Sequence, residues 1–179
     1  MILKIIVVIV TIAYPFIVYF GLTHFDSTVV MFFIITLLTI KGLTEKQHNT
    51  RKVIFVAVFG VLVIAYFWGN QQGLKLYPVL VNAAMLLLFT SSLYAKQSII
   101  ERMARLKEPD LPESGVQYTR KVTIVWCIFF TLNGLIALFT ALWASNKVWL
   151  FYNGFLAYVL IGILVITEWI VRYRVKQRA

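Results

Sequence analysis

The segment 96–121, KQSIIERMARLKEPDLPESGVQYTRK, carries most of the side chains that could bind a charged group in water. It holds six of the 17 Lys/Arg and four of the seven Asp/Glu residues of the chain. Arginine suits an anionic phosphate because its planar guanidinium makes two hydrogen bonds at once. We therefore expect this segment to bind an anionic lipid or protein, and we do not expect a catalytic centre. The candidate binding residues, here and near the end of the chain, are Glu101, Arg102, Arg105, Arg120, Trp126, Glu168 and Arg172.

Two of these candidates lie inside apolar stretches and have simpler alternatives. Glu168 is followed four residues later by Arg172, so the two can form an ion pair at the membrane edge. The functional alternative is a buried carboxylate that holds Arg172 toward an anionic headgroup. Trp126 is most simply a packing residue, although it stands one helical turn from the basic segment.

Three asparagines, Asn82, Asn133 and Asn153, interrupt apolar stretches. Polar groups inside hydrocarbon are costly, so each needs a partner. Asn133 and Asn153 are each followed by a glycine, which predicts interhelical hydrogen bonds where small residues let two backbones approach. A polar cavity or ligand site is the alternative.

Signatures of soluble enzymes are absent from the sequence. It has no phosphate-cradling glycine loop, no HExxH or GxSxG motif and no pair of cysteines, since Cys127 is alone. His24 and His48 fall on opposite sides of the membrane in the topology given below, so they cannot share a metal ion. We expect no metal and no cofactor, and the sequence favours a protein that is not an enzyme.

The composition excludes an ordinary soluble domain. The chain is 61% hydrophobic and 13% charged, whereas soluble domains are about 45–50% apolar and about 25% charged. A transmembrane helix needs about 20 mostly apolar residues. The sequence therefore predicts an all-α integral membrane protein, a single-domain bundle of six transmembrane helices, with five as the alternative if the short second stretch only dips into the bilayer. The predicted spans are residues 5–21, 28–43, 53–69, 77–95, 122–143 and 148–171.

The positive charges fix the predicted orientation. With both termini in the cytoplasm, all of the 17 Lys/Arg except Lys75 and Lys147 lie on the cytoplasmic side, as the positive-inside rule requires. The net charge of +10 then reflects topology, and we expect no nucleic acid partner. The outer connections, 22–27, 70–76 and 144–147, are too short to fold into domains.

The polar segment is expected to begin as a helix over 96–107 with an apolar stripe. Ile99, Ile100, Met103 and Leu106 form the stripe, and Glu101, Arg102 and Arg105 lie off it. Glu101 and Arg105 stand four residues apart, which predicts a supportive pair along the helix. A basic amphipathic helix of this kind lies in the plane of the membrane interface. Pro109 and Pro112 then stop the helix, and Gly115 allows a turn before residues 118–121 return to the membrane, so 96–121 is predicted as an interfacial helix with a rigid elbow.

Residues 77–179 resemble known families of bacterial membrane proteins. The resemblance rests on the runs PVLVNAAMLLLFTSSL, IIERMARLKEPDLPESGVQYTRKVTIVWCIFFTLNGLIALFTA and WLFYNGFLAYVLIG. They look like a family encoded beside acyl carrier proteins in aryl-polyene-type gene clusters and, more distantly, are similar to the intracellular septation protein A (YciB) family. The resemblance implies a multi-pass protein of the bacterial inner membrane, associated with envelope assembly, and gives no catalytic residue.

Three functions are compatible with this sequence. The first is an accessory protein of cell-envelope lipid or acyl-product metabolism, whose basic cytoplasmic face binds anionic lipid or an acidic acyl carrier protein. The second is a small lipid or metabolite transporter or flippase, for which six helices are few unless the protein forms a homodimer. The third is a scaffold of the division or elongation machinery, with other envelope-biogenesis proteins as partners.

Overall fold

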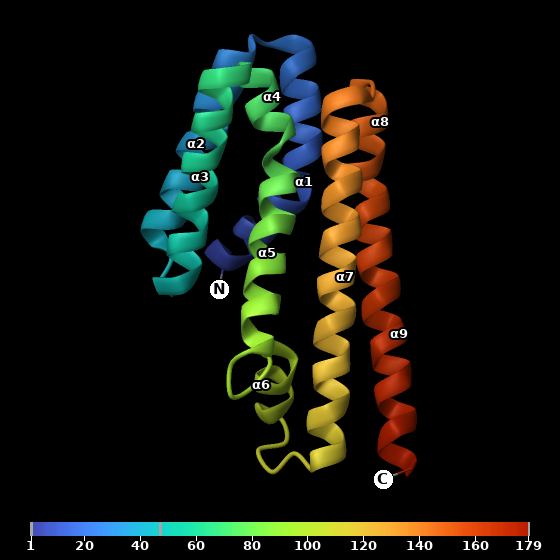
Figure 1. Cartoon of the computed structure of the whole chain (residues 1–179). Coiled ribbons are helices and arrows are strands. Elements are labelled where there is room, and N and C mark those ends of the chain that lie inside the picture. Colours follow the sequence, from blue (N-terminus) through green and yellow to red (C-terminus); the bar gives the residue numbers. More distant parts are fainter. Residues whose placement is uncertain (1, 47, 179) are drawn as a thin grey trace. The chain divides into compact units, whose positions relative to one another are not determined.

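The computed structural model describes residues 2–46 and 48–178, with side chains for residues 13–46, 48, 51, 52 and 54–173. Every regular element in these ranges is a helix, which confirms the all-α prediction (Figure 1). The helices pack as two compact units. Unit 1 comprises Met1–Val81 and Leu135–Ala157, and unit 2 comprises Asn82–Gly134 and Tyr158–Ala179.

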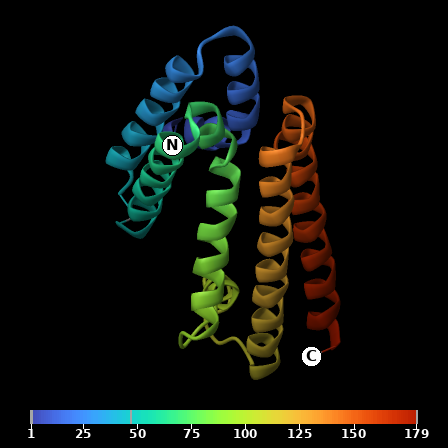
Figure 2. The ribbon, with the colours of Figure 1, turned by 45° about the horizontal axis from the view of Figure 1, so that its top comes forward.

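Unit 1 is built on α1 (Ile2–His24), α2 (Ser27–Thr44) and α3 (His48–Trp68), followed by the short α4 (Asn70–Lys75). Its second part holds the end of α7 (Glu113–Trp143), then α8 (Asn146–Phe151) and the π-helix η1 (Tyr152–Leu156). α2 and α3 lie side by side in both ribbon views (Figure 2). The core that joins these elements includes Tyr14, Val18, Ile34, Val61, Leu74, Ala141 and Trp149.

The predicted outer connection 70–76 contains the short helix α4, which the sequence did not predict. The chain leaves α3 at Gly69, whose φ of 89° lies in the left-handed region that favours glycine. α4 then packs back on α3, and a Cβ at Gly73 would lie 2.9 Å from the Cβ of Ala65 and 3.0 Å from the Val61 carbonyl oxygen. This close approach buries Gly73, Leu74 and Lys75.

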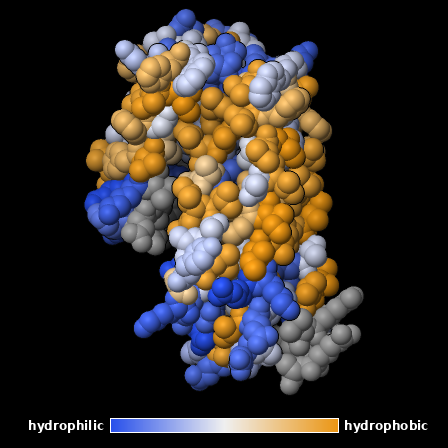
Figure 3. Space-filling view, in the orientation of Figure 1, coloured by the Kyte–Doolittle hydropathy of each residue, from blue (hydrophilic) through white to orange (hydrophobic). Residues whose placement is uncertain are grey.

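Unit 2 contains most of α5 (Tyr77–Leu93), the short α6 (Ile99–Arg105), the first part of α7 and most of α9 (Ala157–Arg178). Within this unit α5 and α7 are joined by an aromatic cluster, in which the ring of Phe89 lies 5.1 Å from that of Phe130. Figure 3 shows hydrophobic side chains along the helices of this unit and hydrophilic ones at the end that carries α6.

The helix boundaries around α6 differ from those predicted. α6 spans seven residues instead of 96–107, and α7 begins at Glu113, well before the predicted span 122–143. α7 starts directly after Pro112, whose carbonyl accepts a hydrogen bond from the Val116 amide at 3.0 Å. Gly115 is helical and supports no turn. Its missing side chain leaves room for Leu111, whose Cδ1 would lie 2.9 Å from a Cβ at this position.

Each predicted span is mostly helical, although 53–69 and 77–95 extend past the ends of α3 and α5. The helices differ in their capacity to cross a membrane. Three described helices are long and apolar enough: Ser27–Thr44, Glu113–Trp143 and the continuous helix Asn146–Tyr173. Ile54–Trp68 and Tyr77–Leu93 are apolar but shorter. The span 5–21 lies in α1, where the side chains up to residue 12 lie outside the described residues. The number of six crossings stays a prediction.

Candidate functional sites

The start of α6 is fixed by two serines. Ser98 is its N-cap, and its hydroxyl accepts a hydrogen bond from the Glu101 amide at 3.3 Å. The hydroxyl of Ser92, near the end of α5, accepts a hydrogen bond from the Ile99 amide at 3.1 Å. Both serines are buried. These contacts hold the short helix against the end of α5, although seven residues would not form a stable helix alone.

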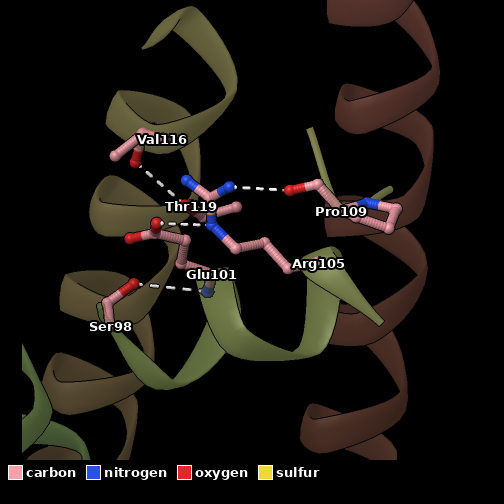
Figure 4. Close-up of polar contacts among 6 residues, drawn as sticks. All are labelled: Ser98, Glu101, Arg105, Pro109, Val116 and Thr119. Atoms are coloured by element: carbon pink, nitrogen blue, oxygen red, sulfur yellow. Dashed lines mark hydrogen bonds and ion pairs between the residues drawn. The ribbon is translucent and has the colours of Figure 1, made fainter. Parts of the chain in front are cut away.

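Glu101 and Arg105 form the ion pair that their spacing predicts. The Arg105 Nε lies 2.9 Å from the Glu101 Oε1, and Arg105 Nη1 donates a second hydrogen bond to the Pro109 carbonyl at 2.8 Å (Figure 4). The Glu101 side chain is 6% exposed and that of Arg105 is 28% exposed. Arg105 therefore neutralises a buried carboxylate and ties α6 to the loop that follows it.

One polar residue of α6 is buried although it lies off the predicted apolar stripe. Glu101 is buried together with Ala104, three residues on, whereas Met103 is 60% exposed and Leu106 is 85% exposed. The physical reason is that Arg105 removes the penalty of burying Glu101, and the small Ala104 lets this face approach its neighbours. The exposed face thus presents Met103 and Leu106.

Cations flank the two exposed apolar side chains. Arg102 and Lys107 are both exposed, and each is next in sequence to one of them. Arg120, on α7, is exposed as well. The outer face of α6 and the residues after it, formed by Arg102, Met103, Leu106 and Lys107, is called the α6 face below. It combines apolar surface with positive charge.

Trp126 packs among the aromatic side chains of unit 2. Its ring lies 6.1 Å from that of Phe89, 5.8 Å from Phe129 and 5.5 Å from Phe130. Tilted and edge-on pairs at these separations contribute about 0.5–1.5 kcal/mol each beyond their buried area. This environment corresponds to the packing alternative for Trp126.

The ion pair predicted between Glu168 and Arg172 is absent, since the only ion pair among the described residues joins Glu101 and Arg105. Both side chains are half-buried, and Arg172 lies in the last described turn of α9. α9 is tied to α7 here through its backbone, because the Tyr118 hydroxyl donates to the Glu168 carbonyl oxygen at 3.2 Å.

Asn82 and Asn133 meet between α5 and α7 in unit 2. The Asn133 Nδ2 donates to the Asn82 Oδ1 at 2.9 Å, and the two residues are 7% and 8% exposed. Gly134 allows this approach, since a Cβ there would lie 3.2 Å from the Asn82 Cβ. The hydrogen bond required by the packing alternative is therefore present.

Asn153 is a member of η1 in unit 1. Its Nδ2 donates to the Thr140 hydroxyl at 3.1 Å and to the Trp149 carbonyl oxygen at 3.0 Å. The neighbouring Gly154 lies against Phe16 of α1, whose ring carbons would be 3.2 and 3.3 Å from a Cβ. π-helical turns occur frequently at functional sites. The turn here fixes Asn153 and Gly154 in the interior of the unit.

A further polar site in unit 1 was missed by the sequence reasoning. The Tyr14 hydroxyl donates to the Leu74 carbonyl oxygen at 2.7 Å, and Trp149 Nε1 donates to the Lys75 carbonyl oxygen at 3.1 Å. Two side chains from α1 and α8 thus satisfy the last carbonyls of α4. Lys75 itself is 4% exposed, and burial lowers the pKa of its ammonium group.

Gln72 lies one turn before Lys75 on α4. Its Oε1 is the one buried side-chain nitrogen or oxygen atom without a hydrogen-bond partner among the described residues. The signal in the sequence was weak: Lys75 is one of two cations predicted outside, and NQQGLK has the polarity of a turn.

Comparisons with known proteins give a distant relationship. No family model and no solved structure matches the chain. It is 34% identical over 104 residues to the inner membrane-spanning protein YciB of Klebsiella pneumoniae, which covers 57% of this chain and 54% of the relative. YciB of Escherichia coli is 30% identical over 103 residues with the same coverage. YciB of Buchnera aphidicola is 26% identical over 128 residues, covering 70% of this chain and 69% of that protein.

The match to the Klebsiella and Escherichia proteins thus spans about half of their length. The match agrees with the more distant of the two resemblances that the sequence indicated, the one to the YciB family. Together with the long apolar helices, the similarity identifies a YciB-like, multi-pass protein of the inner membrane.

Proposed function

We propose that this protein is an accessory component of cell-envelope lipid or acyl-product metabolism that binds anionic lipid headgroups through the α6 face. One observation carries the proposal: Met103 and Leu106 are exposed between the exposed cations Arg102 and Lys107, while the nearby Glu101 is buried and neutralised. A surface of this kind suits a membrane that presents hydrocarbon and negative charge at the same depth.

The energetics favour a lipid surface over bulk water. Burying an apolar side chain of this size contributes roughly 1.5–3 kcal/mol. Each Lys or Arg near an anionic leaflet contributes about 1 kcal/mol. Because Arg105 already pairs with Glu101, the carboxylate of Glu101 does not oppose this attraction.

The positive-inside distribution of Lys/Arg supports a cytoplasmic position for the α6 face. The same charges suit an acidic acyl carrier protein, which is the competing partner. The apolar pair favours lipid, because an exposed Met and Leu at the end of a membrane helix already lie near the bilayer interface.

Native mass spectrometry of the detergent-solubilised protein tests whether Arg102 and Lys107 bind anionic lipid. We expect preferential binding of phosphatidylglycerol over phosphatidylcholine, and a loss of about 30-fold in that preference in the double variant Arg102→Gln/Lys107→Gln, from roughly 1 kcal/mol for each cation. The matched control Arg120→Gln/Lys121→Gln removes two exposed cations from α7 and should retain most of the preference. Equal loss in both double variants contradicts the role of the α6 face.

The insertion of Leu106 into the membrane interface is tested separately. A Leu106→Cys variant in a Cys127→Ala background, labelled with an environment-sensitive fluorophore, should give blue-shifted emission in phosphatidylglycerol nanodiscs. Emission as in water contradicts insertion. Salt-sensitive binding of an acyl carrier protein that needs Arg102 and Lys107, without a lipid preference, would assign the α6 face to the protein partner instead.

A further inference from the structure

An apolar groove lies between α1 and α2 in unit 1, where the two helices diverge from the short loop that joins them (Figure 2). Its volume is about 480 Å³, within the range of about 300–1,000 Å³ that is typical of ligand pockets. The residues that line it include Ile17, Phe20, Gly21, His24, Val29 and Phe33. Apart from His24, every described side chain that lines the groove is apolar.

The groove lies on helices that face lipid. α1 and α2 touch at Gly21 and Val30, since a Cβ at Gly21 would lie 2.9 Å from the Val30 Cγ2. Phe20 and Phe33, which also line the groove, are 56% and 54% exposed. α2 is long and apolar enough to cross a membrane. A hydrocarbon chain is therefore the group that is available to fill the groove.

His24 gives the groove a polar end, and its hydrogen bonds fix which nitrogen carries the proton. Its Nδ1 lies 2.9 Å from the Phe20 carbonyl oxygen and 2.9 Å from the Thr23 hydroxyl, which itself donates to that carbonyl at 2.9 Å. A carbonyl oxygen only accepts, so these contacts hold together only when Nδ1 is protonated. In the neutral ring Nε2 is then an acceptor, and no described residue bonds to it.

The charge beside His24 favours a cationic headgroup over an anionic one. The connection 22–27, LTHFDS, contains the exposed Asp26 and no Lys or Arg, although the chain has a net charge of +10. A group beside Nε2 must donate a hydrogen bond, and a nearby carboxylate favours a donor that is positively charged. The ammonium group of phosphatidylethanolamine meets both conditions. Phosphatidylcholine is charged but has no N–H donor, and phosphatidylglycerol is negative.

We propose that the groove between α1 and α2 binds phosphatidylethanolamine, with the upper part of one acyl chain along its apolar walls and the ammonium group at the His24 Nε2. From Ile17 to His24 α1 rises about 10 Å, which sets the length of chain in contact. The chain contributes little selectivity, because lipid tails are as apolar as the side chains around them. The hydrogen bond at His24 contributes the selectivity, since charged donors form stronger bonds than neutral ones.

Native mass spectrometry of the full-length protein in dodecyl maltoside, after removal of co-purified lipid, tests the role of His24. The probes are dioleoyl phosphatidylethanolamine and phosphatidylcholine with the same chains. We expect the wild-type protein to bind the former about tenfold more tightly, which corresponds to about 1.4 kcal/mol. His24→Phe keeps an aromatic ring and should bind both lipids equally, whereas His24→Gln keeps an acceptor and should retain part of the preference.

A matched variant of the other histidine controls for the loss of an imidazole. His48→Phe changes an exposed residue on α3, outside the groove, and should keep the tenfold preference. The Arg102→Gln/Lys107→Gln variant should keep it too, so that the groove and the α6 face can fail separately. No preference in the wild-type protein, or an unchanged preference in His24→Phe, would overturn the proposal.

The acyl chain is tested by filling the groove. Val29→Trp places a large ring in it and should weaken the binding of phosphatidylethanolamine several-fold. The control Val56→Trp makes the same change on α3 at a residue that is also exposed but lies outside the groove. Thermal unfolding of both variants checks that they are folded. Equal affinities in the two variants would contradict binding in the groove.

Discussion

In unit 2 the buried carboxylate of Glu101 has its arginine one helical turn away, whereas in unit 1 the buried residue Lys75 has no acidic partner among the described residues. The amides differ in the same way. Asn82 and Asn133 bond to each other in unit 2, whereas the Gln72 Oε1 in unit 1 has no partner in the described part of the chain. The difference teaches that a buried polar group has two distinct effects: a paired one joins helices, whereas an unpaired one costs stability.

Removing Arg105 should have the largest effect. Arg105→Met leaves the Glu101 carboxylate buried without its cation, and we expect the free energy of unfolding to fall by about 2–3 kcal/mol, below the usual range for a buried pair because Arg105 is partly exposed. Unfolding in SDS, followed by circular dichroism, measures this. Glu101→Gln keeps a hydrogen-bond acceptor for Arg105 and should lose less than about 1 kcal/mol. Similar losses in both variants would show that the pair is unimportant.

Breaking the amide pair should have the next largest effect. Asn133→Leu leaves the Asn82 amide without this partner, at an expected loss of about 1–2 kcal/mol in the same SDS assay. The double variant Asn82→Leu/Asn133→Leu should lose less than the sum of the single variants, with a coupling of roughly 0.6 kcal/mol, typical of such bonds in membranes. Strict additivity would place the two asparagines in separate roles.

Removing Lys75 should raise the free energy of unfolding, whereas the two changes above lower it. In detergent, Lys75→Met keeps an apolar chain of similar length at this position and removes a charge that partial burial disfavours, and we expect the free energy of unfolding to rise by less than about 1 kcal/mol. The comparison of the two units fails if Lys75→Met destabilises the protein as strongly as Arg105→Met does.

The helix caps should give the smallest effect, and only one of them depends on pH. Hydrogen bonding with the Thr28 side chain, and then with its backbone amide, lowers the pKa of the Asp26 carboxyl below its usual 3.8. The cap therefore stabilises the fold fully above that value and loses this contribution as the pH falls through the lowered folded-state pKa. Any Tm difference between wild type and Asp26→Asn should disappear at that acidic end. The neutral cap Ser98 gives a contrast, because Ser98→Ala should lower the Tm equally at both ends of the pH range.

Hydropathy predicted the long helices well because a long apolar stretch by itself indicates a membrane-spanning helix. It placed their ends less well where polar residues are helical. α4 was missed because a run of Asn, Gln and Gly is more typical of a turn than of a helix. The close packing of Gly73 on the Val61 backbone, which accompanies the helix, cannot be recognised from the sequence. The early start of α7 at Glu113 was missed because hydropathy marks only the apolar part of a helix, and the first turns of α7 are polar.

The candidate sites were predicted where partners are close in sequence. The spacing of Glu101 and Arg105 was enough to predict their ion pair. The same spacing failed for Glu168 and Arg172, since helix periodicity allows a contact but does not select the rotamers that make it. The burial of Lys75 depends on Tyr14 and Trp149, which are distant in sequence, so no local pattern could reveal it.

The π-helix η1 makes this region sensitive to chain length. A π-turn contains one residue more than an α-helical turn would, so α8 and α9 are out of step with a continuous α-helix. Deleting one residue from Tyr152–Leu156 would rotate Trp149 about 100° relative to the residues after the turn. Trp149 could then no longer reach the Lys75 carbonyl oxygen while Gly154 stayed against Phe16. Insertions and deletions here should be tolerated far less than substitutions, because the number of residues in the turn sets the rotation between Trp149 and Gly154.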